Sequence, residues 1–303
     1  MTDLILDVTK GEDRTFSLSE FMDFVQSEVD INDFESIKEA GWALRALSND
    51  RNFLLEAYND ELAAIVEGSS KNVLTPQTII LARGEGYYLR SNIWLPASEA
   101  VQFRDRESKL TAYGLPHDHN FHFLTVGYYG DGYATDVFRY DNKLVAGFIG
   151  EDAHLEFVGN FQLKPGMVMA YEAGRDVHVQ YEPDDIAISI NFMAIPASTY
   201  FQQQLSFDLQ EGLVAAGLTD SVGTRLFLLS FIENNFDARS VELLSRAAID
   251  YPCVRTRSQA LRIVGNLDPS MHRRLLKSID SETERLSHYE LVHAGQARQI
   301  DAA

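Results

Sequence analysis

Residues 114–127 read GLPHDHNFHFLTVG and place three histidines at the start of an aromatic and β-branched run. The run from Phe121 to Tyr129 is typical of a buried β-strand. Because a strand points residues i and i+2 to the same face, His117 and His119 are expected to project together. Two neighbouring imidazoles on one wall of a β-structure form half of a metal site, so further ligands are expected elsewhere in the chain.

His122 belongs to the same stretch but differs from His119 in strand parity, so on a regular strand it faces away from the pair. A bulge or turn at Asn120 would return it to the site. The sequence therefore leaves His122 open, as an extra ligand, as a side chain that supports the ligands, or as a histidine on the outer surface.

Charge and cysteine content restrict the class of protein. The chain has 303 residues, a formal net charge of −19 and one cysteine. Such acidity opposes binding to nucleic acids and to anionic membranes, because both interactions need basic residues. One cysteine allows no intrachain disulfide, and neither a transmembrane segment nor an apolar leader is evident. These features predict a cytoplasmic protein that binds neither nucleic acid nor membrane.

Helical patterns occur at both ends of the chain. Ser17 and Glu20 form a capping-box pattern at the start of one predicted helix. Apolar spacing returns to a helical period from about Ser206, and Asp268-Pro269 is typical of the start of a last helix. We expect a helical N-terminal segment at 1–70 and a C-terminal helical domain, a bundle, at 205–295.

The middle of the chain, 71–200, is rich in Val, Ile, Phe and Tyr and is divided by Gly, Pro and Asp clusters. Many short strands at such spacing predict a sandwich or barrel rather than an alternating α/β domain. The predicted strands are Thr78–Ala82, Tyr87–Trp94, Phe121–Tyr129, Ala134–Tyr140, Leu155–Gln162, Met167–Tyr171, Val177–Tyr181 and Ile186–Met193.

A second stretch completes the site. Residues 163–180 read LKPGMVMAYEAGRDVHVQ, in which one turn precedes a strand and a second turn leads to a histidine. Together the two stretches resemble the two motifs of the cupin superfamily, over roughly residues 75–195. The residues that match are His117, His119 and Gly130 in the first motif and Gly166, Gly174 and His178 in the second.

The resemblance implies a mainly β fold with flanking helices, in which a cupin-like double-stranded β-barrel (jelly roll) encloses a metal. The first cupin motif continues with a glutamate, but here that position falls on Phe123 or Leu124. The implied ligands are therefore His117, His119 and His178 alone, as in the thiol dioxygenase branch. Three neutral imidazoles suit Fe(II), with Zn, Ni or Cu as alternatives, and leave coordination positions open.

Other side chains could act beside the metal. The phenols of Tyr128, Tyr129 and Tyr133 either contact a substrate or pack between strands. Arg139 or Arg90, if it faces the interior, would hold a substrate carboxylate; on the outer face it would be solvated. We take Tyr128 and Arg139 as the candidate catalytic residues.

Three charged residues, Glu172, Arg175 and Asp176, surround the second motif. A metal-binding imidazole usually donates its other N–H to a carboxylate or carbonyl oxygen, so Glu172 is a candidate to orient His178. The alternative is that these residues are exposed turn residues.

The function predicted from these features is that of a non-haem Fe(II) oxygenase acting on a small organic, amino-acid-like or peptide substrate. 2-Oxoglutarate dependence is disfavoured, because no arginine follows His178 until Arg225. No phosphate-binding loop or dinucleotide motif is present. A zinc or nickel isomerase, lyase or hydrolase, and a non-enzymatic ligand-sensing or interaction protein, remain alternatives. The flanking helices could form a homodimer or bind a protein partner.

Overall fold

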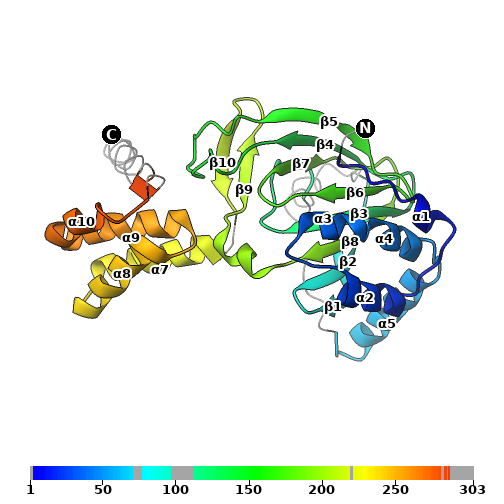
Figure 1. Cartoon of the computed structure of the whole chain (residues 1–303). Coiled ribbons are helices and arrows are strands. Elements are labelled where there is room, and N and C mark those ends of the chain that lie inside the picture. The colour runs from blue at the N-terminus through cyan, green and yellow to red at the C-terminus, as the bar shows by residue number, and fades with distance from the viewer. Residues whose placement is uncertain are drawn as a thin grey trace.

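The computed structural model describes residues 3–70, 77–96, 112–218, 221–280, 283–284 and 286. Its centre is formed by antiparallel β-sheets, shown in Figure 1. The first sheet has the strand order β1-β2-β8-β3-β6. Its strands are β1 (Thr78–Gly84), β2 (Tyr87–Trp94), β3 (His122–Tyr129), β6 (Val168–Tyr171) and β8 (Ala187–Ala194).

The second layer contains the ladder β5-β4-β7 and the hairpin β10-β9. An extended stretch around His117 lies between them, because His117 forms bridges to both His178 and Ser206. One end of the histidine stretch is therefore held on two sides by backbone pairing. The strands are β4 (Ala134–Arg139), β5 (Glu156–Gln162), β7 (Asp176–Gln180), β9 (Leu205–Asp208) and β10 (Leu213–Gly217).

The central strands of the first sheet are buried on both faces. On β3, Leu124 packs against the N-terminal helices, whereas Phe123 belongs to a second apolar cluster between the sheets. Phe192 and Met193 divide in the same way on β8. This two-residue alternation follows from strand geometry, and it explains why these strands are almost continuously apolar.

The N-terminal helices cover the outer face of the first sheet (Figure 1). Ser17 accepts a hydrogen bond from the N–H of Glu20 and donates its own N–H to the Glu20 carboxylate, which is the predicted capping box. Phe21 and Leu44 are fully buried against the sheet. The helices are α1 (Thr9–Glu12), α2 (Leu18–Glu28), α3 (Phe34–Glu39), α4 (Gly41–Ser48) and α5 (Phe53–Val66).

The prediction that helical structure resumes near Ser206 is wrong for residues 205–217, which form the hairpin β9–β10. Gly212 has φ of +71° between the two strands, a conformation that glycine adopts without steric penalty. A four-residue apolar spacing over so short a segment does not distinguish a helix from a hairpin. Pairing of Ser206 with the stretch at His117 favours the strand.

Beyond a short 3₁₀ helix (Ala197–Phe201) and the hairpin, the remaining helices project to one side of the sheets (Figure 1). They pack on one another through a cluster that includes Leu244, Leu261 and Val264. Asp237 and Asp268 cap two of them. The helices are α7 (Ser221–Asn234), α8 (Ala238–Asp250), α9 (Val254–Leu267) and α10 (Pro269–Leu275).

The fold class is therefore mixed, with antiparallel sheets and helices before and after them in the chain. The predicted closed barrel is not seen: within the described ranges, no strand ladder joins the first sheet to the second layer. No helix in the described part of the chain is long and apolar enough to cross a membrane. The division into units at 1–70, 71–200 and 205–295 stays a prediction.

Candidate metal centre

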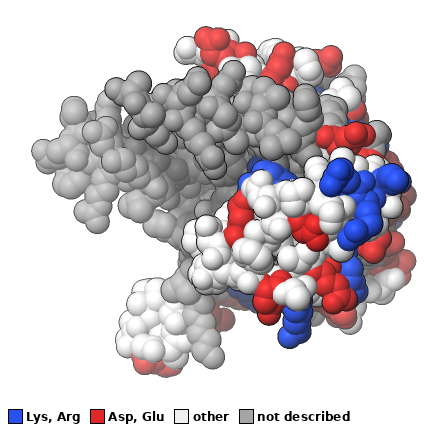
Figure 2. Space-filling model, turned by 90° about the vertical axis from the view of Figure 1, so that its left-hand side faces the viewer, with Lys and Arg blue, Asp and Glu red and all other residues white. Residues whose placement is uncertain are grey.

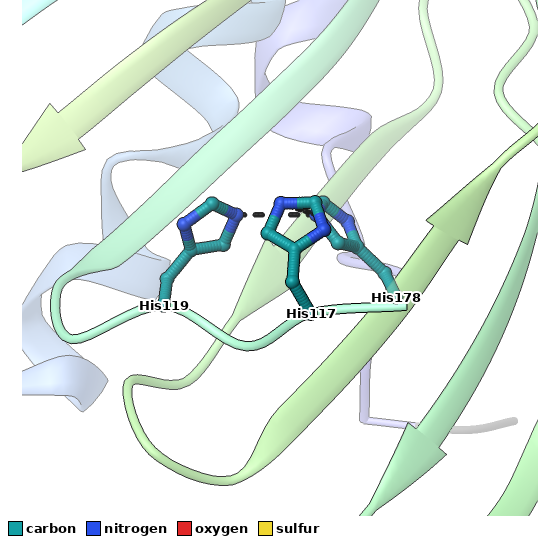
Figure 3. Close-up of side chains that lie close together, drawn as sticks. All are labelled: His117, His119 and His178. Carbon is teal, nitrogen blue, oxygen red and sulfur yellow. Dashed lines mark hydrogen bonds between the residues drawn. The ribbon is translucent and has the colours of Figure 1, made fainter. Parts of the chain in front are cut away.

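Three histidines meet between the sheets. The backbones of His117 and His178 exchange two hydrogen bonds, with N···O distances of 3.2 and 2.9 Å. On the other side of the stretch, Asp118 donates its N–H to Leu205. His119 follows two residues after His117 and points to the same cluster, as Figure 3 shows.

The nitrogen positions suit a metal ion. The Nε2 atoms of His119 and His178 lie 3.1 Å apart, and those of His178 and His117 lie 3.3 Å apart. Two nitrogens bound to one ion at about 2.0–2.1 Å stand roughly 3.0–3.4 Å apart for ordinary coordination angles. All candidate ligand atoms of the three residues lie within 4.8 Å of one another. His178 thus already stands at the spacing of a shared ligand set from both His117 and His119.

The other ring nitrogens are held by neighbouring polar groups. His117 Nδ1 lies 2.8 Å from the carbonyl oxygen of Leu115, so it donates there and leaves Nε2 free to bind a metal. His119 Nδ1 lies 3.3 Å from Gln204 Nε2, and that amide also donates to the Asp118 carbonyl. These contacts fix how the imidazoles are turned.

Gln180 stands beside His178. Its Nε2 lies 3.1 Å from His178 Nδ1 and 3.0 Å from His178 Nε2, while its Oε1 is buried without a hydrogen-bond partner among the described residues. Turning this amide by 180° would let Oε1 accept from Nδ1–H and would leave His178 Nε2 for a metal. The orphaned oxygen is therefore accounted for by a metal-binding tautomer of His178.

Burial keeps the three imidazoles neutral. His117, His119 and His178 are 6%, 9% and 3% exposed. Desolvation lowers the pKa of His117 and places the pKa values of His119 and His178 well below their ordinary value, and the nearby charge of Arg90 acts in the same direction. Neutral imidazole is the form that binds metals, so the cluster is chemically ready to hold one.

A cavity of about 340 Å³ opens onto the histidines. Trp94 and Tyr133 form part of its wall, with ring centroids 4.1 Å apart. Burial raises the pKa of Tyr133 to about 12, so its hydroxyl keeps its proton. The described lining residues are Gln77, Thr78, Arg90, Asn92, Trp94, Ala112, Leu115, His117, His119, Phe123, Tyr133, His178, Gln180 and Asn191.

Tyr128, a candidate catalytic residue, lies away from this cavity. Its hydroxyl donates to the Asp50 carbonyl oxygen at 3.0 Å, and its ring packs edge-on against Phe53. Tyr128 has the same parity as Leu124 and Val126, and that face of β3 is covered by the N-terminal helices. The catalytic role predicted for Tyr128 is therefore corrected to packing between sheet and helix. Tyr129 is 58% exposed.

Arg139, the other candidate, also lies outside the cavity. It forms ion pairs with Asp176 at 2.8 Å and with Asp3 at 2.7 Å. This pairing raises the pKa of Arg139 above its ordinary value. Arg90 instead lines the cavity, so of the two arginines considered for a carboxylate it is Arg90 that faces the metal centre.

His122 and Glu172 contact neither a ligand imidazole nor the cavity. His122 stacks on Phe34 of α3, and its Nδ1 accepts from the N–H of Ala173 at 3.0 Å. This position agrees with its parity and excludes it as a ligand in this arrangement. Glu172 forms an ion pair with Arg175 at 2.6 Å, so its predicted contact with His178 is not present.

Three polar residues of the site were not recognised in the sequence: Gln180, described above, and Asp118 and Gln204. Asp118 is 0% exposed and accepts hydrogen bonds from Tyr140 Oη and Leu205 N, both at 2.6 Å. Its parity, opposite to that of both flanking histidines, could have indicated that it points away from the metal. Gln204 lies in a region for which the sequence predicted no role, and only the fold brings it to His119.

The second motif also shapes the site through its backbone. Gly174 has φ of +64°, and its N–H donates to the carbonyl oxygen of His119 at 2.7 Å. A Cβ added here would meet Asn142 Nδ2 at 2.2 Å. The turn before β7 therefore needs glycine to hold His119 in place.

Comparisons with known proteins give only weak similarities to solved structures. No protein-family model matches the chain, and no curated protein matches it. Similar solved structures include the hydroquinone 1,2-dioxygenase PnpCD, at 12% identity over 42% of this chain and 69% of that one, with a TM-score of 0.26. The salicylate 1,2-dioxygenase of Pseudaminobacter salicylatoxidans is 11% identical over 47% of this chain and 33% of its own, with a TM-score of 0.24.

A cupin domain from Bordetella pertussis is 14% identical over 41% of this chain and 99% of its own, with a TM-score of 0.23. A cupin domain is thus among the structures to which this chain is similar. Each of these matches covers less than half of the chain. With identities and TM-scores this low, we take no activity from the neighbours and argue from the histidine cluster itself.

Proposed function

We propose that this protein is a metal-dependent oxidoreductase of cupin type that binds Fe(II) through His117, His119 and His178. The observation that carries the proposal is the set of three buried, neutral imidazoles whose Nε2 atoms stand at metal-sharing distances beside a cavity. Neutral imidazole is a ligand for Fe, Zn, Cu and Ni alike. Three protein ligands leave coordination positions for other molecules, which is the arrangement of a catalytic rather than a structural site.

The chemistry supplied there would be that of a redox-active ion that brings O₂ and a small organic substrate together. The protein's own residues would hold the metal and surround the substrate. Leu115, Gln180 and Gln204 orient the imidazoles, and Trp94, Phe123 and Tyr133 form an aromatic part of the cavity wall. The Tyr133 hydroxyl, which remains protonated, is available as a hydrogen-bond donor.

A zinc or nickel isomerase, lyase or hydrolase could use the same three histidines, since this donor set does not select one of these metals. A ligand-sensing protein without activity would require no metal in the cluster. The cavity reaches the imidazoles directly and so offers a place for a substrate in either kind of enzyme, and the choice between them depends on the metal and on O₂ uptake. Adding 2-oxoglutarate to the reaction tests the prediction that it is not required.

The deciding experiment is elemental analysis of protein purified without oxygen, followed by O₂ uptake with small organic acids, amines and thiols. We expect one equivalent of iron and substrate-dependent O₂ uptake. His119→Ala should lose both, because a buried ligand nitrogen is removed. His154→Asn is the matched control: the imidazole of His154 is exposed, and asparagine tolerates its φ of 50°.

Retention of metal and turnover by His119→Ala would contradict the proposed centre. Bound zinc with no O₂ uptake would favour the isomerase, lyase or hydrolase alternative. A protein that binds no metal under any of these conditions would support a non-enzymatic role.

We propose that the cavity binds small molecules or amino-acid-like groups. The proposal also includes a cytoplasmic location and no binding to nucleic acid or membrane. Figure 2 views the side of the molecule from which the C-terminal helices project, and shows Asp and Glu side chains among Lys and Arg side chains there. The helices outside the sheets remain candidates for dimer formation or for a protein partner.

A further inference from the structure

Arg90 points between the sheets from the middle of β2. Its backbone is paired with Asn191 of β8 and Ile80 of β1, so it is central to the first sheet. The preceding residue, Leu89, is fully buried against the N-terminal helices. Strand alternation therefore directs Arg90 to the opposite face, where it lines the cavity with the three histidines.

The Arg90 guanidinium has no counter-ion in the described part of the chain. Its Nε is shut off from solvent and makes no hydrogen bond, and no ion pair with a described carboxylate is formed. Two other partly buried arginines do have carboxylate partners: Arg139 pairs with Asp3 and Asp176, and Arg262 pairs with Glu233. Arg90 is half-buried, and a guanidinium that loses water at Nε without gaining an anion is unfavourable, because desolvation is not offset by a partner.

The other described residues of the cavity wall supply no negative charge. None of its described lining residues is Asp or Glu, and the polar groups apart from Arg90 and the histidines are amides and hydroxyls. Burial lowers the pKa of Arg90 below its ordinary value, which marks the same lack of a compensating anion. A guanidinium nevertheless stays charged at neutral pH. The cavity therefore presents one fixed positive charge beside three neutral metal-binding imidazoles.

We propose that Arg90 binds the carboxylate of a small organic acid, which is the substrate class of this metal centre. That the bound acid is a substrate rests on the function proposed above. Binding of the acid itself needs only Arg90 and the cavity. A guanidinium matches a carboxylate through two parallel N–H···O bonds. Arg90 is thus the residue that determines specificity, and Arg139 has no part in it.

Several features favour a carboxylate over a phosphate. Arg90 is the one lysine or arginine among the described lining residues, which balances a single negative charge. A phosphate carries more charge and is usually met by several cationic or backbone N–H donors. The indole of Trp94 and the phenyl ring of Phe123 offer an apolar surface for the remainder of the acid.

The test measures binding of defined probes to the full-length protein by calorimetry, without added metal and again after addition of Co(II), whose visible spectrum reports any probe that binds the metal itself. The probes are acetate, lactate, benzoate and phenylacetate, the primary amide of each, and inorganic phosphate. We expect at least one carboxylate to bind and its amide to bind at least about tenfold more weakly, since a hydrogen bond to a charged group contributes about 1.5–3 kcal/mol.

Arg90→Gln should weaken binding of that carboxylate by at least about tenfold, and Arg90→Lys should weaken it less, because it keeps the charge and loses the fork. Arg83→Gln is the control: Arg83 is an exposed arginine on the neighbouring strand β1. Equal binding by wild type and Arg90→Gln, binding of amides as tight as that of acids, binding of phosphate but not of any carboxylate, or no carboxylate bound at all would each overturn the proposal.

The two proposals fail separately. Protein that holds iron and consumes O₂ with a neutral substrate, yet binds no carboxylate, would retain the metal centre and reject the role of Arg90. Protein that binds a carboxylate through Arg90 but holds no metal would retain the anion site and reject the oxidoreductase. Far-UV circular dichroism of each variant checks that it is folded.

Discussion

Replacing Asp118 by alanine is expected to destabilise the fold and to weaken metal binding together. Asp118 sits between two ligand histidines, but its carboxylate points away from them and accepts from Tyr140 Oη and Leu205 N at 2.6 Å each. These bonds hold the histidine stretch to β9 and to the end of β4. Because the carboxylate is 0% exposed, no water replaces it as an acceptor when it is removed.

The magnitude follows from the two bonds. Each hydrogen bond to a charged group contributes about 1.5–3 kcal/mol, so Asp118→Ala should lower the free energy of unfolding by about 3–6 kcal/mol. Tyr140→Phe removes one of the two bonds and should lower it by about 1.5–3 kcal/mol. Loosening the stretch should also reduce zinc affinity by about 10- to 100-fold, as loss of a group that orients ligands usually does.

Urea denaturation followed by tryptophan fluorescence measures the stability, and competition with a chromophoric chelator measures zinc affinity. A loss for Asp118→Ala no larger than that for Tyr140→Phe would show that the bond to Leu205 contributes nothing. Unchanged zinc affinity in a folded Asp118→Ala protein would refute the idea that Asp118 positions the histidines.

Two further predictions test the electrostatics and the corrected role of Tyr128. Burial lowers the pKa values of His119 and His178, so below the unfolded value near 6.5 the unfolded chain takes up protons that the folded apoprotein does not. The stability of the apoprotein should therefore fall as the pH drops from 7 to 5. The accompanying fall in urea midpoint should be smaller in His119→Ala. Tyr128→Phe should lower stability by about 0.5–1.5 kcal/mol through loss of the bond to Asp50, with the metal content measured by elemental analysis unchanged.

Strand positions could be predicted from the sequence to within a few residues, because alternation and turn residues are local signals. Tyr87–Trp94 was predicted and found with the same bounds, and the Ser17 capping box was also predicted correctly. The hairpin at 205–217 was missed, since its apolar spacing also fits a helix. Its strand character depends on pairing with a stretch almost 90 residues earlier.

The alternation of side chains along a strand predicted their direction correctly where only one strand was involved. It predicted that His117 and His119 point together and that His122 points elsewhere, and the structure places them so. It did not say which face of a strand is interior. Tyr128 and Arg139 were selected without knowing which face of their strands is interior, and both face away from the cavity.

The sequence by itself determined which side chains share a face, because the two-residue period of a strand is a property of the local backbone. It therefore brought His117 and His119 to one side of their stretch. Tertiary structure alone decided which face became the cavity wall, because that depends on the surfaces packed against each sheet. The N-terminal helices cover the face of Leu89 and Tyr128, and this leaves Arg90 beside the histidines, enclosed between the sheets.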